Sequence, residues 1–311
     1  MKKAILGFLG IVVVACLAVG QEVIWRVPTD FATIQAAIDS DYVWPGQTIF
    51  VEPGNHAGAL IKKQVEIRGE GNAIINTGPL HGSGMTMGFR FLAGSDGASL
   101  NHLTFDGVDL AIMNGDAVDD VTVDHCTFNN TVQAISNWRG NGWVISHNDI
   151  VDLRTRNGGG IGILVADYLG GVVQDNIVSH NKISGTLHVS AGDGGGYCGT
   201  GIVLYADFRW GRLGALEIKD NRVTKNNVAL VSDTPEVVDV VAFELTDTRN
   251  ISYSPEFPAV IYDNSITFND FRGTLVQISL TPFDLGLYND ISRNLGEDRG
   301  LRRNSKAFYI E

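Results

Sequence analysis

The chain has 311 residues, and its 35 acidic and 23 basic residues give a formal net charge of −12 at pH 7. Binding to a phosphate backbone needs a basic surface, so this charge argues against a nucleic-acid partner. A polyanionic ligand is also disfavoured unless a cation or a local group of arginines screens the repulsion.

Residues 1–20 are predicted to be an export signal rather than part of the fold. Lys2 and Lys3 precede an apolar run, "AILGFLGIVVVACLAVG", that is too short and too early to span a membrane. Two processing routes remain open: "AVG" before Gln21 suits a general signal peptidase, whereas "VVAC" resembles a lipobox that would attach a lipid to Cys16. We expect a secreted or periplasmic monomer with no transmembrane segment after signal removal, and a single domain over residues 21–311.

The first element of the domain is predicted to be a short capping helix. The segment "TDFATIQAAIDS", residues 29–40, has Thr29 or Asp30 as its N-cap, and its apolar residues share one face: Phe31, Ile34, Ala37 and Ile38. A stack of repeats exposes an apolar end, which such a helix would cover. Residues 47–56, "QTIFVEPGNH", then supply the first strand, and residues 65–71, "VEIRGEG", supply the next.

A repeated pattern runs through the rest of the chain. Five segments place a polar residue two positions before an apolar one: "VDHCTFNN", "SHNDIVD", "SHNKISG", "KDNRVTK" and "YDNSITF". The equivalent positions are predicted to be Leu103, Cys126, Asn148, Asn181, Asn221 and Asn264. Their spacings of 23, 22, 33, 40 and 43 residues have a minimum near 22. Coils of three short strands, with loops inserted at one turn, would give this pattern.

The composition of these segments favours stacked coils. Short strands rich in Val, Ile and Thr cannot each bury a face alone, but strands stacked about 4.8 Å apart share one continuous core. Asn suits the same place in successive coils because its amide donates and accepts along the stack and its backbone tolerates the left-handed conformation. A β-sandwich would show regular hairpin turns and a propeller would show fixed blade periods, and the sequence shows neither. We therefore predict an all-β fold, a right-handed parallel β-helix of about seven to nine coils.

The opening segment and the coils together resemble a known superfamily. Pectin-lyase-like right-handed parallel β-helix proteins commonly begin with "tIqaAid…pGdtI.V.pG.Y" and continue with coils of "N.I..N", and the resemblance covers nearly the whole mature chain. It implies the fold but matches no specific enzyme family. The fold hosts lyases, hydrolases, esterases, epimerases, phage tailspikes and non-catalytic surface proteins, so it does not imply one activity.

The catalytic motifs of several enzymes in this superfamily are missing. "GNHAGAL" replaces the "GxYxE" of pectin methylesterases, and their "QDTL" and "DFIFG" do not occur. Polygalacturonases use "NTD", "DD" and "GHG" motifs to place an acid and a base across the scissile bond. Asp119 and Asp120 form the only comparable pair, but they lack the flanking motifs and fall at an expected turn.

Pectate lyases offer a closer resemblance. Their "vWiDH" is similar to "VTVDH", residues 121–125, although Thr122 replaces the Trp. Family lyases bind calcium with carboxylates and abstract a proton with an Arg from "RxPR"; here "LRTRN" contains Arg154 and Arg156 without the Pro. The alternative is that Asp124 and His125 are a solvated or ladder-capping pair of an ordinary coil.

Three aspartates recur at intervals of 40 and 40 residues: Asp167, Asp207 and Asp247. In one register they would stack within about 5 Å of one another per layer, and such like charges need a cation, arginine partners or splayed side chains. The arginines nearby in the sequence are Arg209, Arg212 and Arg249. One interpretation is a row that binds calcium, the candidate cofactor, or takes part in catalysis. The other is that each Asp caps its own turn.

Two Gly-rich insertions, residues 154–160 and 185–201, are predicted to form one rim at the same turn of adjacent coils. Loops on a rigid scaffold often carry binding residues, and aromatic side chains there can stack on sugar faces. The predicted catalytic residues are Asp207, Arg209 and His188. The predicted substrate-binding residues are Arg154, Arg156, Asp193, Tyr197, Tyr205, Trp210 and Arg212.

The remaining cysteines and the C-terminal segment add little to this picture. After Cys16 only Cys126 and Cys198 remain, which permits one disulfide in an oxidising compartment, although Cys126 is predicted to be an inward ladder site. Residues 286–311 are charged and lack apolar periodicity, so they are expected to be an irregular cap or a solvated tail.

Three functions remain open from the sequence. The preferred one is binding, and cleavage by lyase chemistry if the protein is an enzyme, of a polysaccharide or cell-envelope glycan in a lateral groove. In such a lyase an Arg or Tyr would take the proton α to a uronate carboxylate that a cation neutralises. The alternatives are a non-catalytic envelope or adhesion solenoid and a glycoside hydrolase with paired carboxylates about 6.5 to 9.5 Å apart.

Overall fold

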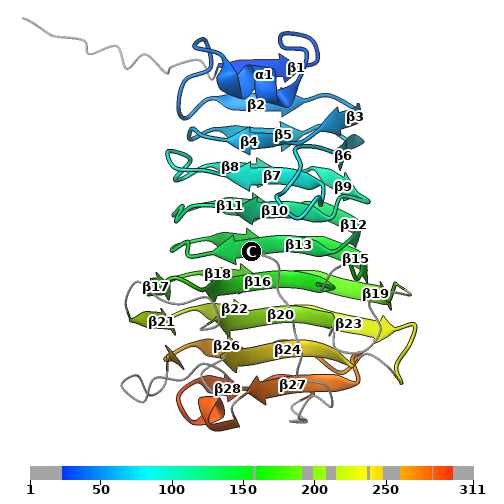
Figure 1. Ribbon diagram of the computed structural model, residues 1–311, viewed down its shortest axis with the longest axis vertical. Helices are drawn as coiled ribbons and strands as arrows, with labels where there is room; N and C mark the ends of the chain where they lie inside the picture. Colours follow the sequence, from blue (N-terminus) through cyan, green and yellow to red (C-terminus); the bar gives the residue numbers. More distant parts are fainter. Residues whose placement is uncertain are drawn as a thin grey trace, which may run out of the picture.

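The computed structural model describes residues 23–156, 159–190, 199–207, 215–236, 239–247, 260–281 and 283–296. These residues form a right-handed parallel β-helix, as predicted, with coils stacked along one long axis (Figure 1). The predicted export signal and Cys16 lie outside the described residues, as do residues 297–311 of the predicted C-terminal tail. The expectation of an irregular segment was wrong for residues 286–296, because they contain a further parallel strand, Asp290–Ser292.

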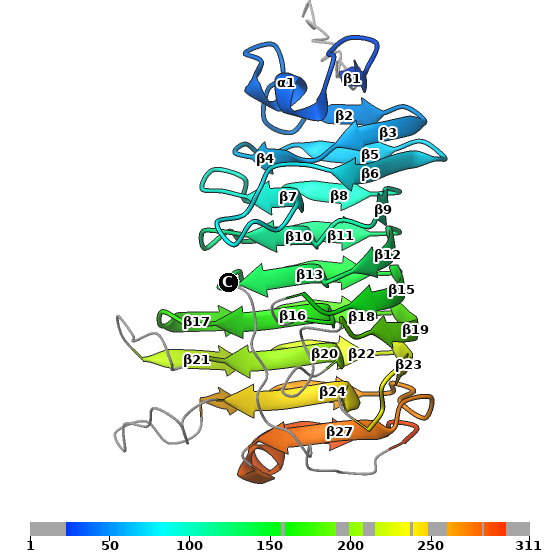
Figure 2. The ribbon, with the colours of Figure 1, turned by 45° about the vertical axis from the view of Figure 1, so that its right-hand side comes forward.

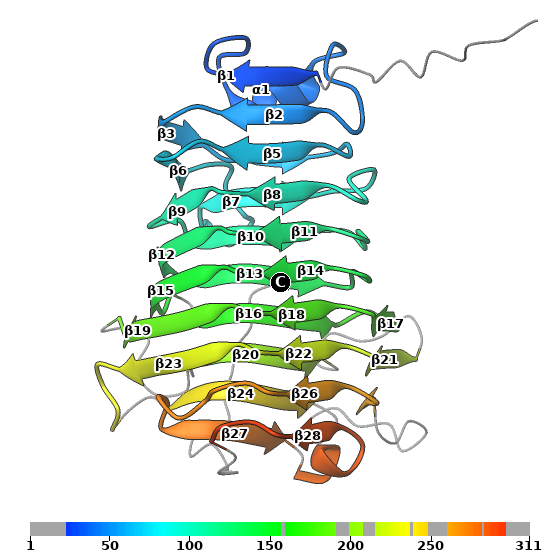
Figure 3. The same ribbon diagram turned by 180° about the vertical axis from the view of Figure 1, so that it is seen from behind.

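Each coil passes through three sheets, whose strands pair in parallel with those of the coils before and after. Sheet A, seen from behind in Figure 3, contains β1 (Ile24–Val27), β2 (Thr48–Val51), β5 (Glu66–Gly69), β8 (Ser99–Asn101), β11 (Thr122–Asp124), β14 (Val144–Ser146), β18 (Ile177–Ser179), β22 (Arg222–Thr224), β26 (Ser265–Thr267) and β28 (Asp290–Ser292).

Sheet B, visible along the right-hand side of Figure 2, follows sheet A in each coil. It contains β3 (Gly54–Ala57), β6 (Ala73–Thr77), β9 (Thr104–Asp106), β12 (Thr127–Thr131), β15 (Asp149–Arg154), β19 (Lys182–His188) and β23 (Asn227–Ser232).

Sheet C completes each coil and faces the viewer in Figure 1. It contains β4 (Ala59–Ile61), β7 (Met87–Phe91), β10 (Leu110–Asn114), β13 (Gln133–Trp138), β16 (Ile161–Asp167), β20 (Gly199–Ala206), β24 (Val240–Asp247) and β27 (Val276–Thr281). Within the described residues its eight strands agree with the predicted seven to nine coils. A small further sheet joins β17 (Gly171–Gln174), β21 (Leu216–Lys219) and β25 (Ile261–Tyr262), and a 3-10 helix, η1, covers Phe283–Leu287.

A short helix, α1 (Ile34–Asp39), covers the first coil (Figure 1). Its apolar face is buried as predicted, with Ile34, Ala37 and Ile38 in the core. The predicted N-cap was wrong: Thr33, rather than Thr29 or Asp30, accepts the Ala36 N–H at its Oγ1, at 3.0 Å. A further strand, β1, also precedes the predicted first strand and pairs with β2. None of the helices in the described part of the chain has the length and hydropathy to cross a lipid bilayer.

The interior is filled by columns of apolar side chains in register. On sheet C one column comprises Ile112, Ile135, Ile163, Ile202 and Phe243. Burying each such side chain contributes roughly 1.5–3 kcal/mol. A second column runs beside the first and extends back to β7 and to the residue before β4. It holds only small residues: Gly58, Gly88, Ala111, Ala134, Gly162, Gly201 and Ala242. The reason is close approach of the next layer, since a Cβ on Gly162 would lie 2.5 Å from the Gly201 carbonyl oxygen.

Asparagine side chains form two ladders, whereas the sequence analysis had predicted one. The first ladder lies where sheet A turns into sheet B: Asn148, Asn181, Asn226, Asn269 and Asn294. The second lies where the chain enters sheet A: Asn176, Asn221, Asn264 and Asn289. Asn221 and Asn264 therefore do not continue the column of Asn148 and Asn181. Each three-residue strand of sheet A has a bend at both of its ends, and Asn fits either bend. The two sets of Asn are therefore five residues apart in the chain and are easily mistaken for one set in the sequence.

Cys126 occupies the layer before Asn148 in the first ladder, as predicted. Its backbone N–H donates to Asn148 Oδ1 at 3.0 Å, and its side chain is a buried free thiol. Burial raises the pKa of this thiol to about 12. Cys198, the other cysteine considered for a disulfide, lies outside the described residues.

Candidate functional site

A pocket of about 230 Å³ lies on sheet C, where four successive strands end and the chain turns toward sheet A. Its lining residues come from β7, β10, β13 and the turns that follow β10, β13 and β16: Arg90, Met113, Asn114, Gly115, Trp138, Arg139 and Tyr168. We call this the sheet C pocket. The regular stacking of parallel strands places these residues, which are up to 78 positions apart in the chain, on one face.

The backbone around Trp138 is held by the layers on both sides. Its N–H donates to Asn114 Oδ1 at 2.6 Å, and Asn114 Nδ2 donates in turn to the Trp138 carbonyl and to the Asp116 carbonyl. On the other side, the Arg139 N–H donates to the Ala166 carbonyl at 2.7 Å. Arg139 has a φ of 71°, a left-handed conformation that costs free energy in a residue with a Cβ.

Aromatic rings make up one side of the pocket. Trp138 lies edge to face with Tyr168, at 5.5 Å between ring centroids, and with Tyr205 at 6.3 Å. Trp138 and Tyr205 are buried, while Tyr168 is partly exposed. Aromatic pairs of this geometry contribute roughly 0.5–1.5 kcal/mol beyond their buried area, so the tryptophan is held rigidly.

Two buried N–H donors of the pocket residues have no hydrogen-bond partner within the described part of the chain: Arg90 Nε and Trp138 Nε1. A buried donor left unsatisfied costs about 1–3 kcal/mol, so an acceptor supplied by a ligand would recover that cost. The Arg90 guanidinium lies against Gly115, where a Cβ would be 2.2 Å from Arg90 Nη2.

The pocket carries net positive charge although the protein is acidic. Arg90 and Arg139 contribute two guanidinium groups, and no lining residue is Asp or Glu. Asp167 lies beside the pocket, with its Oδ1 3.5 Å from Arg139 Nε. Asp167 therefore pairs with one of the two guanidinium groups of the lining, that of Arg139.

The predicted register of the three aspartates was wrong. Asp167 pairs with Ala206, and Ala206 pairs with Asp247, so Asp207 lies one residue further along its strand. The intervals between aligned positions are 39 and 41 residues, from 206 − 167 and 247 − 206, rather than 40 and 40. Asp167 and Asp247 are consequently two layers apart, about 10 Å.

Asp167 behaves as the capping interpretation expects. Its carboxylate accepts the Leu169 N–H at 2.9 Å and the Gly170 N–H at 3.2 Å. Calcium holds its oxygen ligands at about 2.3–2.6 Å, so one ion cannot join Asp167 with Asp247 across two layers. The three aspartates therefore do not fit a shared calcium site.

The other predicted site residues are spread along the coil. His188 ends β19 at the turn from sheet B to sheet C, whereas Tyr205 and Asp207 lie at the far end of β20, about 25 Å away. The two Gly-rich insertions do follow β15 and β19 at the same turn, where the Thr155 N–H donates to the His188 carbonyl. Several predicted residues lie outside the described residues: Asp193, Tyr197, Arg209, Trp210 and Arg212.

Arg154 and Arg156 bind a carboxylate of the protein itself. Arg154 Nη2 donates to Asp109 Oδ1 at 2.8 Å, and Arg156 Nη1 donates to Asp109 Oδ2. Asp109 is buried and also accepts the N–H and hydroxyl of Thr86. Burial, together with the nearby Arg156, lowers the pKa of Arg154, although Asp109 opposes this. The two arginines thus neutralise Asp109, and their role in substrate binding stays a prediction.

Asp124 and His125, from the segment that resembles pectate lyases, lie at the end of β11, where sheet A turns into sheet B. Burial raises the pKa of Asp124, but hydrogen bonds from Ser146, His125 and His147 outweigh it and hold the pKa below its ordinary value. Asp119 and Asp120 lie in the turn before β11, as expected, and Asp119 Oδ1 accepts the Asn141 N–H.

The sequence analysis missed the sheet C pocket, including Arg90, Trp138, Arg139 and Tyr168. One signal was present: the segment "NWRG" places two large side chains, Trp138 and Arg139, at the end of a strand whose residues are all buried. The partners of that turn come from other coils, and their layer-to-layer register was needed to assemble them.

No protein-family model matches the chain, and no match to a curated protein was found. Among solved structures, the catalytic domain of a GH87 α-1,3-glucanase in complex with tetrasaccharides is similar over 91% of this chain and 68% of that chain, with 14% identity and a TM-score of 0.31. The A-module of the mannuronan C-5 epimerase AlgE4 of Azotobacter vinelandii is similar over 86% and 94% respectively, with 13% identity and a TM-score of 0.24. The strand topology described above establishes the parallel β-helix of this chain independently.

Proposed function

We propose that the chain is an exported parallel β-helix protein that binds an acidic polysaccharide and holds one acidic sugar unit in the sheet C pocket. The observation that carries the proposal is a pocket lined by two aromatic rings, Trp138 and Tyr168, and two arginines, Arg90 and Arg139. Two buried donors of these residues, Arg90 Nε and Trp138 Nε1, lack partners within the described residues. Aromatic rings suit sugar faces, and guanidinium groups suit a carboxylate or sulfate.

Charge gives the proposal its specificity for acidic sugars. A chain with a formal charge of −12 repels a polyanion over most of its surface, so an acidic ligand needs a local positive site. Arg90 and Arg139 supply such a site. A neutral glycan would leave the buried Arg90 Nε–H without a charged partner and would gain less from the pocket.

The size of the pocket is consistent with recognition of a single unit. At about 230 Å³ it is smaller than the roughly 300–1,000 Å³ typical of small-molecule sites, so most of a polymer would lie outside it. Long chains bind such a surface by laying neighbouring units along the coils, which are spaced about 4.8 Å apart.

If the protein is an enzyme, the pocket suits elimination better than hydrolysis. Hydrolysis of a glycosidic bond uses two carboxyl groups, and the pocket lining contains none. In elimination, Tyr168 in its deprotonated form would take the proton at C5 of a uronate and would then give that proton to the leaving oxygen. The C4–O bond then breaks, a C4=C5 double bond forms, and the leaving oxygen takes a proton. Arg90 would stabilise the charge that develops on the carboxylate.

Binding and chemistry are tested with one set of variants. The purified chain is titrated with polygalacturonate, alginate and a neutral glucan, while reducing ends and the ultraviolet absorbance of unsaturated products are followed. We expect the uronates to bind and the glucan to bind much more weakly. Arg90→Gln and Trp138→Phe should each weaken uronate binding about fivefold to tenfold, because the first removes the guanidinium group and the second removes the indole N–H donor.

Arg222→Gln is the matched control, since Arg222 is an exposed arginine on sheet A and its substitution changes the net charge equally. Equal weakening by Arg90→Gln and Arg222→Gln would show that only overall charge matters and would contradict the pocket. If the chain binds a uronate but produces neither unsaturated products nor new reducing ends, its role is non-catalytic. If new reducing ends form without the ultraviolet absorbance of unsaturated products, the reaction is hydrolysis.

A further inference from the structure

Four of the seven histidines of the chain form one column on the outside of the molecule, at the corner between sheets A and B. Their ring centroids are 5.3, 4.9 and 4.9 Å apart in the order His102, His125, His147 and His180. We call this column the histidine stack. It is independent of the sheet C pocket, which lies before the sheet A strands rather than after them.

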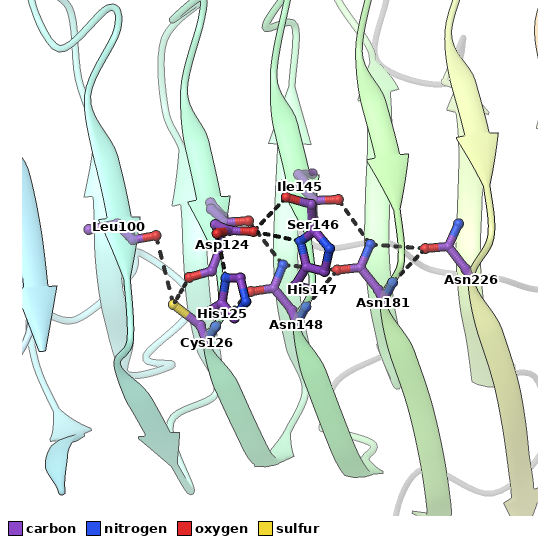
Figure 4. Close-up of polar contacts among 11 residues, drawn as sticks. Leu100, Asp124, His125, Cys126, Ile145, Ser146, His147, Asn148, Asn181 and Asn226 are labelled. Atoms are coloured by element: carbon purple, nitrogen blue, oxygen red, sulfur yellow. Dashed lines mark hydrogen bonds and ion pairs between the residues drawn. The ribbon is translucent and has the colours of Figure 1, made fainter. Parts of the chain in front are cut away.

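The backbone explains why the rings line up. Each histidine follows a sheet A strand and adopts a left-handed φ between 51° and 57°. The next residue in each coil is buried, and after His147 and His180 it is a member of the first ladder, for example Asn148 after His147 (Figure 4). The ladder thus fixes the layer spacing, and successive imidazoles are held at nearly that spacing.

One carboxylate breaks the symmetry of the histidine stack. Asp124 Oδ2 is 2.5 Å from His125 Nδ1, and Asp124 Oδ1 is 3.1 Å from His147 Nδ1 (Figure 4). Ser146 Oγ donates to Asp124 Oδ1 at 2.6 Å and holds the carboxylate between the two rings. Ligand atoms of Asp124, His125 and His147 all lie within 4.8 Å of one another.

We propose that Asp124, His125 and His147 form a binding site for a divalent transition-metal ion, with zinc as the reference ion. Two imidazole nitrogens and one carboxylate oxygen are a donor set that zinc takes readily, and they leave a fourth position for water or another ligand. Calcium and magnesium prefer oxygen donors, so the site should discriminate against them. Both Nδ1 atoms lie within hydrogen-bond distance of Asp124. A bound metal would take the Nδ1 lone pairs, and each ring would then carry its proton on Nε2.

The remaining members of the histidine stack provide a comparison within the same molecule. His102 has the same backbone conformation as His147, with φ values of 54° and 53°, and it is also exposed. Neither His102 nor His180 belongs to the group of converging ligand atoms. A metal bound by Asp124 should therefore depend on His125 and His147 much more than on His102.

The test is zinc titration of the purified, tag-free chain by calorimetry near pH 7.5, where imidazoles are mostly neutral. We expect one zinc per chain and no saturable response to calcium at this site. His125→Asn and His147→Asn should each weaken zinc binding more than about tenfold, and Asp124→Asn should do the same. Asn tolerates the left-handed backbone, so these variants should remain folded, which far-ultraviolet circular dichroism checks.

His102→Asn is the matched control and should leave the zinc affinity within about twofold. Absence of one-to-one zinc binding by the unmodified chain overturns the proposal. Equal weakening by His102→Asn and His147→Asn also overturns it, because the column would then bind metal without a defined site. As a second readout, Co²⁺ should give a visible absorption spectrum that His147→Asn abolishes. None of these measurements depends on glycan binding at the sheet C pocket, so the metal site and the proposed function can fail separately.

Discussion

The first Asn ladder and the sheet C pocket show opposite uses of the same stacked backbone. At the corner that follows the sheet A strands, successive layers repeat one residue type, so Asn181 and its neighbours satisfy one another. At the corner that precedes them, the second ladder repeats Asn in the later coils. In the earlier coils around the sheet C pocket the residue type changes between layers, and Arg90 Nε and Trp138 Nε1 are left without partners in the described structure. The comparison indicates that repetition supplies stability, while a break in the repeat supplies groups that can bind a ligand.

The largest expected effect comes from breaking the first ladder in its middle. Asn181→Leu would remove the acceptor of the Asn148 N–H and Nδ2 and the donor to the Ile145 carbonyl. Each buried group left unsatisfied costs about 1–3 kcal/mol. We expect the free energy of unfolding to fall by roughly 3–5 kcal/mol in chemical denaturation.

Cys126→Asn is the control for this prediction because it extends the first ladder by one layer. The new amide would lie where the thiol now contacts the Leu100 and Asp124 carbonyls, at 3.8 and 3.5 Å. We expect a change of less than about 1 kcal/mol. A loss as large as that of Asn181→Leu would show that any change at this corner is destabilising, whether or not it preserves the repeat.

A smaller loss is expected where the layers approach most closely on sheet C. In Gly162→Ala the new Cβ would lie 2.5 Å from the Gly201 carbonyl oxygen, and backbone cannot move aside as a side chain can. Overpacking of this kind costs about 1–3 kcal/mol, measurable by denaturation. Gly82→Ala has no atom within 4 Å of the added Cβ and should leave stability nearly unchanged.

The smallest effect on stability is expected for a substitution next to the sheet C pocket. In Gly115→Ala the added Cβ would meet only the end of the Arg90 side chain, which can shift. We expect stability within about 0.5 kcal/mol of the unmodified protein but uronate binding weakened about fivefold. Unchanged affinity with a displaced Arg90 would remove this arginine from the proposed binding site.

The fold was predictable because its determinants are local and repeated. The capping helix and the "N.I..N" coils indicate a parallel β-helix before any contact is known. The register between coils was harder to predict from the sequence. Asn221 was assigned to the column of Asn148, and Asp207 to the row of Asp167, because loops of unequal length shift the count by one or by five residues. Spacing alone cannot show which bend of a coil a given Asn occupies.

The sites were harder to predict than the fold for a related reason. Asp124 and His125 were noticed, but His147 completes their cluster only through the stacking of β11 on β14. The sheet C pocket draws on four coils, and only the "NWRG" segment of one coil gives a signal by itself. The predicted roles of His188 and Asp207 remain predictions, and the length of β20 separates them.

The unequal spacing of the first ladder also has a mechanical consequence. If the molecule is pulled from its ends and opens one layer at a time, the layer between Asn226 and Asn269 releases 43 residues, whereas the layer between Asn269 and Asn294 releases 25. At about 3.5 Å per extended residue these correspond to extensions of about 150 and 90 Å. The order of long and short extensions in a single-molecule trace would reveal from which end the stack unravels.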